Sequence, residues 1–190
     1  MPAPRLFLVA PGIPPVDIIA CLEAACAAGD IASIIVPPQL ARAVTSTAQD
    51  LGVAVLTTGD PRDAARIGCD GVHIDADLET YEEARASAGK DRVVGAYCGT
   101  SRHLAMEMAE AGADYVAFSQ NGRSPGGEPI LGWWSEMFEL PCVAFDPVDE
   151  TGLDTLLPQN PDFIRPSETM WSSPDEARRI VSSITARINR

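Results

Sequence analysis

The chain has 190 residues and a formal net charge of −13, with 27 acidic and 14 basic side chains. Its length suffices for one domain, and the hydrophobic fraction of 46% supplies a substantial core. A strongly negative field repels nucleic acid and anionic membrane surfaces, and no apolar run approaches the ~20 residues that span a bilayer. We therefore expect a single domain over residues 1–190 that binds neither nucleic acid nor membranes.

The first residues and the cysteines indicate the cellular compartment. The segment "MPAPRLFLVAPG" lacks the longer hydrophobic region and the small-residue cleavage site of a signal peptide. The five cysteines are widely spaced and form no C-x-x-C pair. Such a set is typical of buried thiols in a reducing compartment. Both observations predict a cytoplasmic protein.

Short apolar runs alternate with amphipathic stretches along the whole chain. The predicted strands, in chain order, are Leu6–Ala10, Ser33–Val36, Val53–Thr57, Gly71–Asp75, Val93–Tyr97, Tyr115–Ser119, Cys142–Phe145 and Asp162–Arg165. The stretches between them have helical periodicity, as in "VDIIACLEAACAAGD" and "SRHLAMEMAEAG". The final helix is predicted to begin with Ser173 as N-cap and Glu176 three residues later, a capping-box pattern.

Alternating strands and helices predict a parallel sheet. Eight strand–helix units average ~24 residues here, close to the minimum for a strand, a helix and two short loops. An internal sequence similarity supports a repeating unit, since "GCDGVHID" and "GADYVAFS" share Gly-x-Asp-x-Val. We expect a small α/β (β/α)₈ TIM barrel as a single domain, with an open doubly wound sheet as the alternative.

In a parallel barrel, functional side chains lie at the carboxyl ends of the strands. The fourth predicted strand ends in "GVHIDADLE", where His73 and Asp75 point the same way because side chains alternate. Asp75 and Asp77 are candidate catalytic residues and candidate oxygen ligands for Mg²⁺. The alternatives are a solvated Asp75 and an Asp77 that caps the next helix. His73 is either a candidate substrate-binding residue or an interior histidine whose hydrogen bonds are made within the protein.

The loops after the fifth and sixth strands carry candidate anion sites. Thr100 and Ser101 stand at a predicted helix N-terminus, where backbone N–H groups attract anions, although ordinary capping explains them equally well. The sixth strand opens into "SQNGRSPGG", which is either an anion cradle or a surface loop. The cradle residues are Ser119, Asn121, Gly122 and Arg123.

Phosphate-binding barrels commonly hold phosphate in the last two loops. Here the seventh strand is followed by Asp146 and Pro147. This makes a poor phosphate site, because proline has no N–H and the carboxylate repels the ligand. After the eighth strand, Ser167 in "RPSETMW" is the candidate substrate contact.

Three segments of the chain resemble the thiamine-phosphate synthase and TenI family. They are "RLFLVAPG", "GCDGVHID" and "VVGAYCGTSRHLAMEMAEAGADYVAF". The resemblance covers most of the chain and implies a small barrel that is often a homodimer. It also implies a reaction that joins hydroxymethylpyrimidine diphosphate to thiazole phosphate, with diphosphate leaving with the help of Mg²⁺ and basic side chains. The TenI-type relatives are thiazole tautomerases.

The resemblance further implies which positions bind the substrates. Gln39 and Arg42 match the family's Gln-x-Arg-x-Lys loosely, without its lysine. Asp60 is what remains of an Asn-Asp pair and joins Asp75 and Asp77 as an implied metal ligand. The family's metal-binding aspartate falls at Leu78, one place after Asp77. The lysine of the loop after the sixth strand is absent, and the Gly-Gly-Ile phosphate loop reads "FDPV".

The missing lysines leave three functions open. The first is a Mg²⁺-dependent thiamine-phosphate synthase, in which arginines replace the missing cations. The second is a catalytically degenerate protein that binds a thiamine precursor or a partner protein. The third is a tautomerase with His73 or His103 as the base. The arginines that could be recruited are Arg5, Arg62, Arg102, Arg123 and Arg165.

Overall fold

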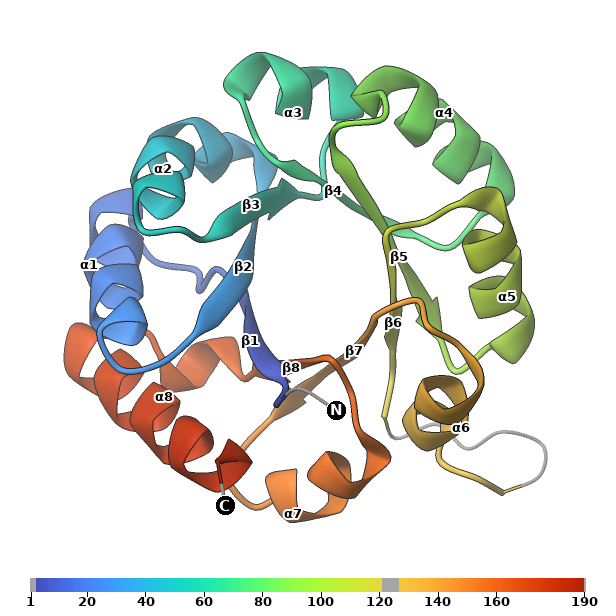
Figure 1. The fold of residues 1–190 in the computed structure, drawn as a ribbon. Coiled ribbons are helices and arrows are strands. Elements are labelled where there is room, and N and C mark those ends of the chain that lie inside the picture. The colour runs from blue at the N-terminus through green and yellow to red at the C-terminus, as the bar shows by residue number, and fades with distance from the viewer. Residues whose placement is uncertain (1–2, 121–126, 190) are drawn as a thin grey trace.

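The computed structural model describes residues 3–120 and 127–189. Its eight strands are all parallel and close into a barrel in the order β1 to β8 (Figure 1). They are β1 Arg5–Val9, β2 Ile31–Val36, β3 Ala54–Thr57, β4 Gly71–Asp75, β5 Val93–Gly99, β6 Tyr115–Phe118, β7 Cys142–Val148 and β8 Phe163–Pro166. The predicted barrel is confirmed, and the open doubly wound sheet is wrong, because β1 pairs with β8.

Helices surround the ring of strands (Figure 1). They are α1 Pro15–Cys26, α2 Pro38–Asp50, α3 Pro61–Ile67, α4 Leu78–Ala88, α5 Arg102–Ala111, α6 Ile130–Met137, α7 Leu153–Leu156 and α8 Pro174–Ile188, with the 3₁₀ turns η1 Leu157–Gln159 and η2 Glu168–Met170. The predicted capping box is present, since Ser173 accepts from the N–H of Glu176 and donates to its carboxylate. None of the helices in the described part of the chain combines the length and hydrophobicity that a membrane span needs.

The strands carry two separate layers of core because their side chains alternate. Side chains on the outer face pack against the helices and include Ile34, Val55 and Val116. Side chains on the inner face fill the barrel and include the buried Phe7, Ile35, Leu56, Tyr115, Ala117 and Val143. Strand β2 is buried at all six positions, as expected for a parallel strand covered on both faces.

The repeated Gly-x-Asp-x-Val segment builds the start of the strands. Asp70, before β4, accepts from the N–H of Val55 at 2.7 Å, and Asp114, before β6, accepts from the N–H of Val94 at 2.7 Å. Asp162, before β8, accepts from the N–H of Cys142 at 2.8 Å. Each carboxylate therefore joins the beginning of one strand to the strand before it, and these aspartates are structural.

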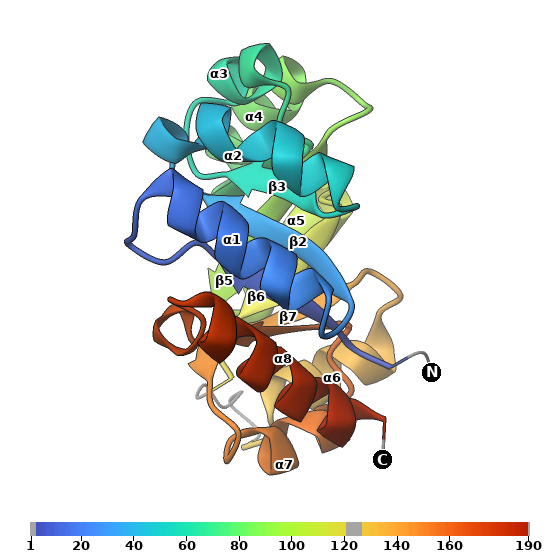
Figure 2. The ribbon, with the colours of Figure 1, turned by 90° about the vertical axis from the view of Figure 1, so that its left-hand side faces the viewer.

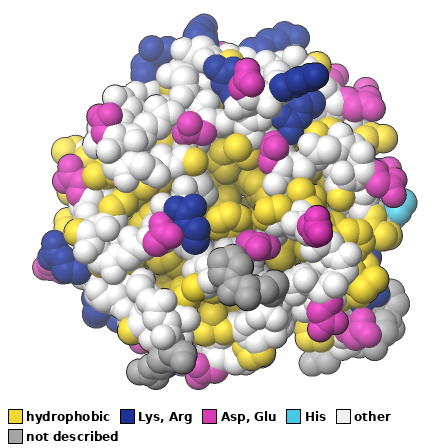
Figure 3. Space-filling view, viewed as in Figure 1, with side chains coloured by type: hydrophobic (Ala, Val, Ile, Leu, Met, Phe, Trp, Pro, Cys, Tyr) yellow, Lys and Arg dark blue, Asp and Glu magenta, His cyan; other side chains and the backbone are white. Residues whose placement is uncertain are grey.

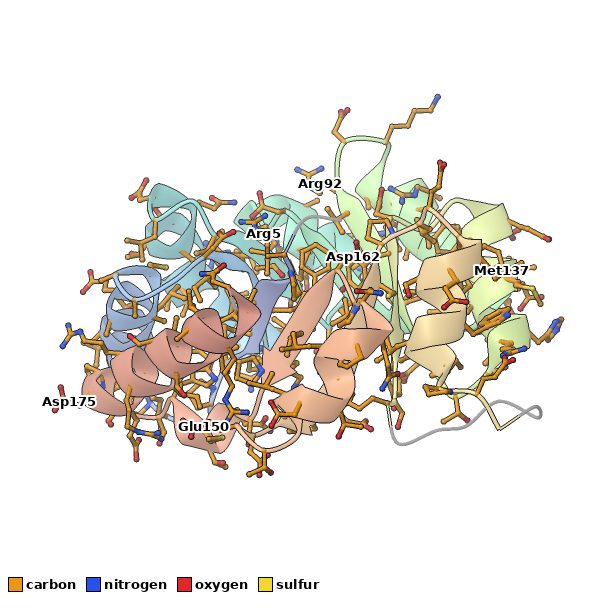
Figure 4. The ribbon with its side chains drawn as sticks, turned by 60° about the horizontal axis from the view of Figure 1, so that its bottom comes forward. Arg5, Arg92, Met137, Glu150, Asp162 and Asp175 are labelled. Atoms are coloured by element: carbon orange, nitrogen blue, oxygen red, sulfur yellow. The ribbon has the colours of Figure 1, made fainter. Side chains whose placement is uncertain are left out.

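The two ends of the barrel are easily distinguished. Both termini lie on the same side of the molecule (Figure 2), and this is the side on which the strands begin. Arg5, Arg92 and Asp162 mark it in Figure 4, while Glu150 and Asp175 lie at the opposite end. Figure 3 shows the amino end, with hydrophobic side chains at its centre and charged ones around them. The carboxyl ends of the strands lie on the far side, where functional sites of parallel barrels are found.

Candidate functional site

A pocket of about 700 Å³ lies at the carboxyl ends of β3 and β4, and we call it the β3–β4 pocket. Its polar lining comes from β4, from the loops that follow β3 and β4, and from α3 and α4: Thr58, Asp60, Arg62, His73, Asp75, Asp77, Thr80, Glu83 and Ser87. The three aspartates that the sequence suggested are therefore brought together in one pocket, with an arginine beside them.

Two of these aspartates also begin helices. Asp60 accepts from the N–H of Arg62 at 2.8 Å and starts α3. The Oδ1 of Asp77 accepts from both the N–H and the hydroxyl of Thr80 at 2.8 Å, and these hydrogen bonds lower the pKa of Asp77. Asp75 is exposed at the end of β4 and makes no side-chain hydrogen bond to another described residue. Asp77 therefore both caps α4 and lines the pocket.

The carboxylates can be tested as a Mg²⁺ site. Among residues 3–120 and 127–189 there is no group of three or more His, Cys, Asp or Glu side chains arranged to hold an ion. Mg²⁺, however, is usually bound by one or two carboxylates and completes its shell with water and substrate phosphates. Asp75 and the Oδ2 of Asp77 fit that mode, because both residues line the pocket and Thr80 occupies only Oδ1.

His73 lies at the inner edge of this pocket and faces the barrel interior. Its Nδ1 is 2.7 Å from the hydroxyl of the fully buried Tyr115. Its ring is stacked on Phe145 with 4.7 Å between centroids. Burial, and then the positive charge of Arg165, lower the pKa of His73 to about 4. Burial also raises the pKa of Tyr115 well above its usual value, so both groups are neutral at physiological pH.

The loops after β5 and β6 place their polar residues in local roles. Ser101 accepts from the N–H of Leu104 at 3.2 Å and caps α5, and Thr100 precedes it on the surface. The hydroxyl of Ser119 donates to Asp146 at 2.6 Å, across to the end of β7. Asn121, Gly122 and Arg123 lie outside the described residues.

At the ends of β7 and β8 lies a second concavity of about 610 Å³, the β7–β8 pocket. Ser167 lines it and hydrogen-bonds Thr169 at 3.0 Å. The lining that the structure describes carries one carboxylate, Asp149, which is engaged by the N–H groups of Thr151 and Gly152. Phosphate-binding barrels hold phosphate at this position, and this pocket instead presents uncharged side chains and a carboxylate.

The candidate residues on α2 follow Pro38, which lies beside Gly59 of the β3–β4 pocket. Gln39 and Arg42 are exposed on the first turns of the helix, and neither lines the β3–β4 or the β7–β8 pocket. Their part in substrate binding stays a prediction.

The arginines that could replace the missing lysines lie in two regions of the structure. Arg5 forms a two-pronged ion pair with Asp30 at the amino end of the barrel, far from the site. Arg102 pairs with Glu128 at 2.7 Å and lies over the ring of Trp133 at 4.0 Å, beside α6. Arg62 lines the β3–β4 pocket, and Arg165, near the carboxyl end of β8, packs against Phe145.

Tyr97 is a mouth residue that the sequence interpretation missed. It stands opposite Asp75 in the β4–β5 register and contacts the ring of Phe145. Burial and then the charges of Asp146 and Asp75 raise the pKa of its hydroxyl, and Arg165 opposes them. The sequence pattern could have identified it, because Val93, Gly95 and Tyr97 are two residues apart and share the inner face of β5.

Comparison with known proteins identifies the family of the chain. Residues 7–164 match the family model described as thiamine monophosphate synthase. A thiamine-phosphate synthase of Rhodospirillum centenum is 36% identical over 187 residues, covering 90% of each chain. One from Hyphomonas neptunium is 31% identical, covering 97% of this chain and 94% of its own.

Solved structures show the same fold. The thiamine phosphate pyrophosphorylase of Pyrococcus furiosus superposes with a TM-score of 0.76 at 15% identity, covering 97% of this chain and 95% of that one. The family model spans most of the chain and the two sequence relatives span nearly all of it, so the chain belongs to the thiamine monophosphate synthase family.

Proposed function

We propose that the protein is a thiamine-phosphate synthase, which joins hydroxymethylpyrimidine diphosphate and thiazole phosphate and releases diphosphate. The observation that carries the proposal is the β3–β4 pocket, where Asp75, Asp77 and Arg62 meet at the carboxyl end of the barrel. Relatives named thiamine-phosphate synthases that are 31% and 36% identical support the same reaction.

The chemistry assigns different roles to the residues of this pocket. The bond between the pyrimidine methylene carbon and the diphosphate oxygen breaks, and the electron pair leaves with the diphosphate. The thiazole nitrogen then donates its lone pair to the methylene carbon. Asp75 and Asp77 would hold Mg²⁺, which supplies charge stabilisation for the leaving diphosphate. Arg62 adds a fixed positive charge at the same wall.

Below the mouth, the interior of the barrel is filled by buried, uncharged side chains. His73 and Tyr115 satisfy each other by a hydrogen bond and carry no charge at neutral pH. A carbocation formed above them would lie near the rings of Tyr97 and Phe145, over an interior filled by buried side chains. With its pKa lowered to about 4, His73 is a weak general base at neutral pH, which favours the synthase over a tautomerase based on it.

The test is a direct assay. The protein is incubated with both substrates and Mg²⁺, and thiamine phosphate is measured through its fluorescent oxidation product. We expect Asp75→Asn to lower kcat/KM by about 100-fold or more, the usual effect of losing one charge-stabilising group.

Asp63→Asn is the matched control for that variant. Asp63 is an exposed carboxylate of α3 that pairs with Arg66 and does not line the pocket. It should keep wild-type activity. Full activity in Asp75→Asn, or no product from folded wild-type protein, would contradict the proposal.

A second candidate is a binding protein that has lost the reaction. The uncharged lining and Asp149 of the β7–β8 pocket favour it, since a neutral thiazole alcohol suits that pocket better than its phosphate. Calorimetry with the unphosphorylated thiazole and with the phosphate separates the two functions. Binding of the alcohol alone, without product in the assay, supports this candidate.

Compartment and assembly complete the proposal. Each of the five cysteines is a free thiol, and four of them are buried, which suits a reducing compartment. We therefore place the reaction in the cytoplasm. The homodimer expected from the family stays a prediction, which light scattering coupled to size-exclusion chromatography tests directly.

A further inference from the structure

Arg165 is a partly sequestered cation at the carboxyl end of β8. Its side chain is 13% exposed. Its Nη1 donates to the carbonyl oxygen of Phe145 at 2.9 Å, and its guanidinium carbon is 4.7 Å from the centroid of the Phe145 ring. Its Nη2 donates to Glu168 at 2.9 Å. The buried Nε has no hydrogen-bond partner among the described residues, so one donor of the guanidinium is left for an acceptor from outside.

The charge of Arg165 acts on the interior of the mouth. It lowers the pKa of His73 and opposes the rise in the pKa of Tyr97. Both side chains point into the barrel, and both contact the ring of Phe145. The guanidinium therefore lies beside the side chains at the top of the barrel interior, and its contacts with Phe145 hold it there.

The position of Arg165 relative to the β3–β4 pocket is informative. In a closed barrel with the strand order β1 to β8, β4 and β8 lie four strands apart and face each other across the ring (Figure 1). The proposed reaction needs two substrates, each with an anionic end, and their reactive carbon and nitrogen must meet between those ends. If the anionic end of one substrate lies beside Asp75 and Arg62, the opposite wall of the barrel, at Arg165, is left for the anionic end of the other substrate.

We propose that Arg165 binds the phosphate of the thiazole substrate, and that Glu168 forms an ion pair with the guanidinium while no phosphate is bound. The inference rests on the proposed function for the identity of the ligand. A guanidinium binds phosphate oxygens through paired, charge-assisted hydrogen bonds. Glu168 is more exposed than its partner, at 36%, and lies in the short turn η2, so it can give way to a phosphate.

The first experiment does not depend on turnover. Inorganic phosphate is titrated into wild-type protein and variants by calorimetry. Arg165→Gln removes the guanidinium charge, and we expect phosphate binding to weaken at least tenfold. Glu168→Gln removes the competing carboxylate, and we expect binding to tighten at least threefold. Arg179→Gln is the matched control, because it also breaks one Arg–Glu ion pair, with Glu150 at 3.0 Å, on the exposed surface of α8. It should bind phosphate like the wild type.

The second experiment is kinetic and identifies the substrate. Arg165→Gln should raise the KM for thiazole phosphate at least tenfold and leave the KM for the pyrimidine diphosphate within twofold. A rise confined to the pyrimidine diphosphate, or equal for both substrates, overturns the assignment.

The two experiments separate this inference from the proposed function. If the wild type makes no product, the synthase proposal fails and the phosphate titration alone decides the role of Arg165. Phosphate binding that is absent in the wild type, or equal in wild type and Arg165→Gln, overturns the inference. If Arg165→Gln does not fold, Glu168→Gln decides, and unchanged or weaker binding in that variant overturns it.

Discussion

The interior of the barrel and its carboxyl mouth each hold a polar pair, and the two pairs behave differently. His73 and Tyr115 lie in the interior, 6% and 5% exposed, and their hydrogen bond satisfies both polar groups. Arg165 and Glu168 lie one layer higher, where Glu168 is 36% exposed and Arg165 keeps an unused donor. The first pair is held together by its own hydrogen bond, and the second can exchange a partner.

The difference shows that depth decides what a polar side chain can do in this fold. Burial removes water from His73 and lowers its pKa to about 4, so it stays neutral. Asp75, two residues further along the same strand, reaches the pocket and remains exposed. One strand thus carries a structural histidine and a candidate catalytic aspartate on the same face. The following variants test this division.

The largest effect on stability is expected from Gly95→Ala. A Cβ at this inner position of β5 would overlap the ring of Tyr115, which occupies the space that glycine leaves. Overpacking of a dense core should cost about 3 kcal/mol or more, since the ring lies within the closed barrel and has little room to shift. The measurement is the free energy of unfolding in urea.

Gly132→Ala is the control for that substitution. Gly132 lies in α6, and its Cβ would meet its nearest neighbour, in Gln159, at 3.9 Å. Alanine should be neutral or stabilise the helix by up to ~1 kcal/mol. Equal stability of Gly95→Ala and the wild type would show that Tyr115 is not locked in place.

The pH dependence of folding should report the burial of His73. The unfolded chain takes up the proton near pH 6.5, while the folded protein resists it until about pH 4. The unfolded state therefore binds more protons between these values, and stability is full above pH 6.5 and lost as the pH falls toward 4. The total is about 3 kcal/mol, from ~1.4 kcal/mol per pKa unit.

The measurement compares urea unfolding of the wild type and His73→Asn from pH 7.5 to 4. Carboxylates titrate in both proteins, so the difference between the two curves isolates the histidine. A constant difference across this range would mean that His73 is accessible to water, and the division between interior and mouth would not hold.

Tyr115→Phe tests the interior hydrogen bond itself. The variant keeps the ring and leaves His73 Nδ1 without its 2.7 Å partner. An unsatisfied buried polar group costs about 1–3 kcal/mol. Tyr97→Phe is the comparison, because the Tyr97 hydroxyl makes no hydrogen bond to the described residues and its loss should change stability by less than ~0.5 kcal/mol. Equal losses in the two variants would argue against a special interior pair.

The smallest effect is expected at the amino end of the barrel. Arg5→Gln breaks the ion pair with Asp30, whose side chains are 47% and 66% exposed. Solvent screens such pairs, so stability should fall by less than ~1 kcal/mol. Synthase activity should stay at the wild-type level because the pair lies at the end opposite the site. A loss of activity would indicate that the site extends through the barrel.

The sequence predicted the fold well and the site in part. The eight strands follow from period-two apolar runs between helical stretches, and each is present in the structure. Asp75 and Asp77 were found because they lie at the end of a predicted strand, and Asp60 was implied by the family resemblance. The structure places all three in one pocket. Gln39 and Arg42 were chosen by resemblance alone, and their exposed positions on α2 could not be deduced from spacing.

The repeated aspartates show the same limit. The sequence shows that Asp70 and Asp114 occupy equivalent places before two strands. It does not show that Asp162 is a third equivalent, because the residues around it differ. Only the structure reveals that each of the three accepts from the N–H of the preceding strand.

The sequence by itself determined the order of strands and helices, the alternation of inner and outer side chains, and the net charge that any anionic substrate must overcome. These depend on neighbours along the chain and on composition. The tertiary structure decided that His73 pairs with Tyr115, that Arg165 packs against Phe145 near the end of β8 and that Arg5 lies at the opposite end of the barrel. Those relations join residues many positions apart, and closure of the barrel fixes them, because it sets which strands are opposite and which side chains lose their water.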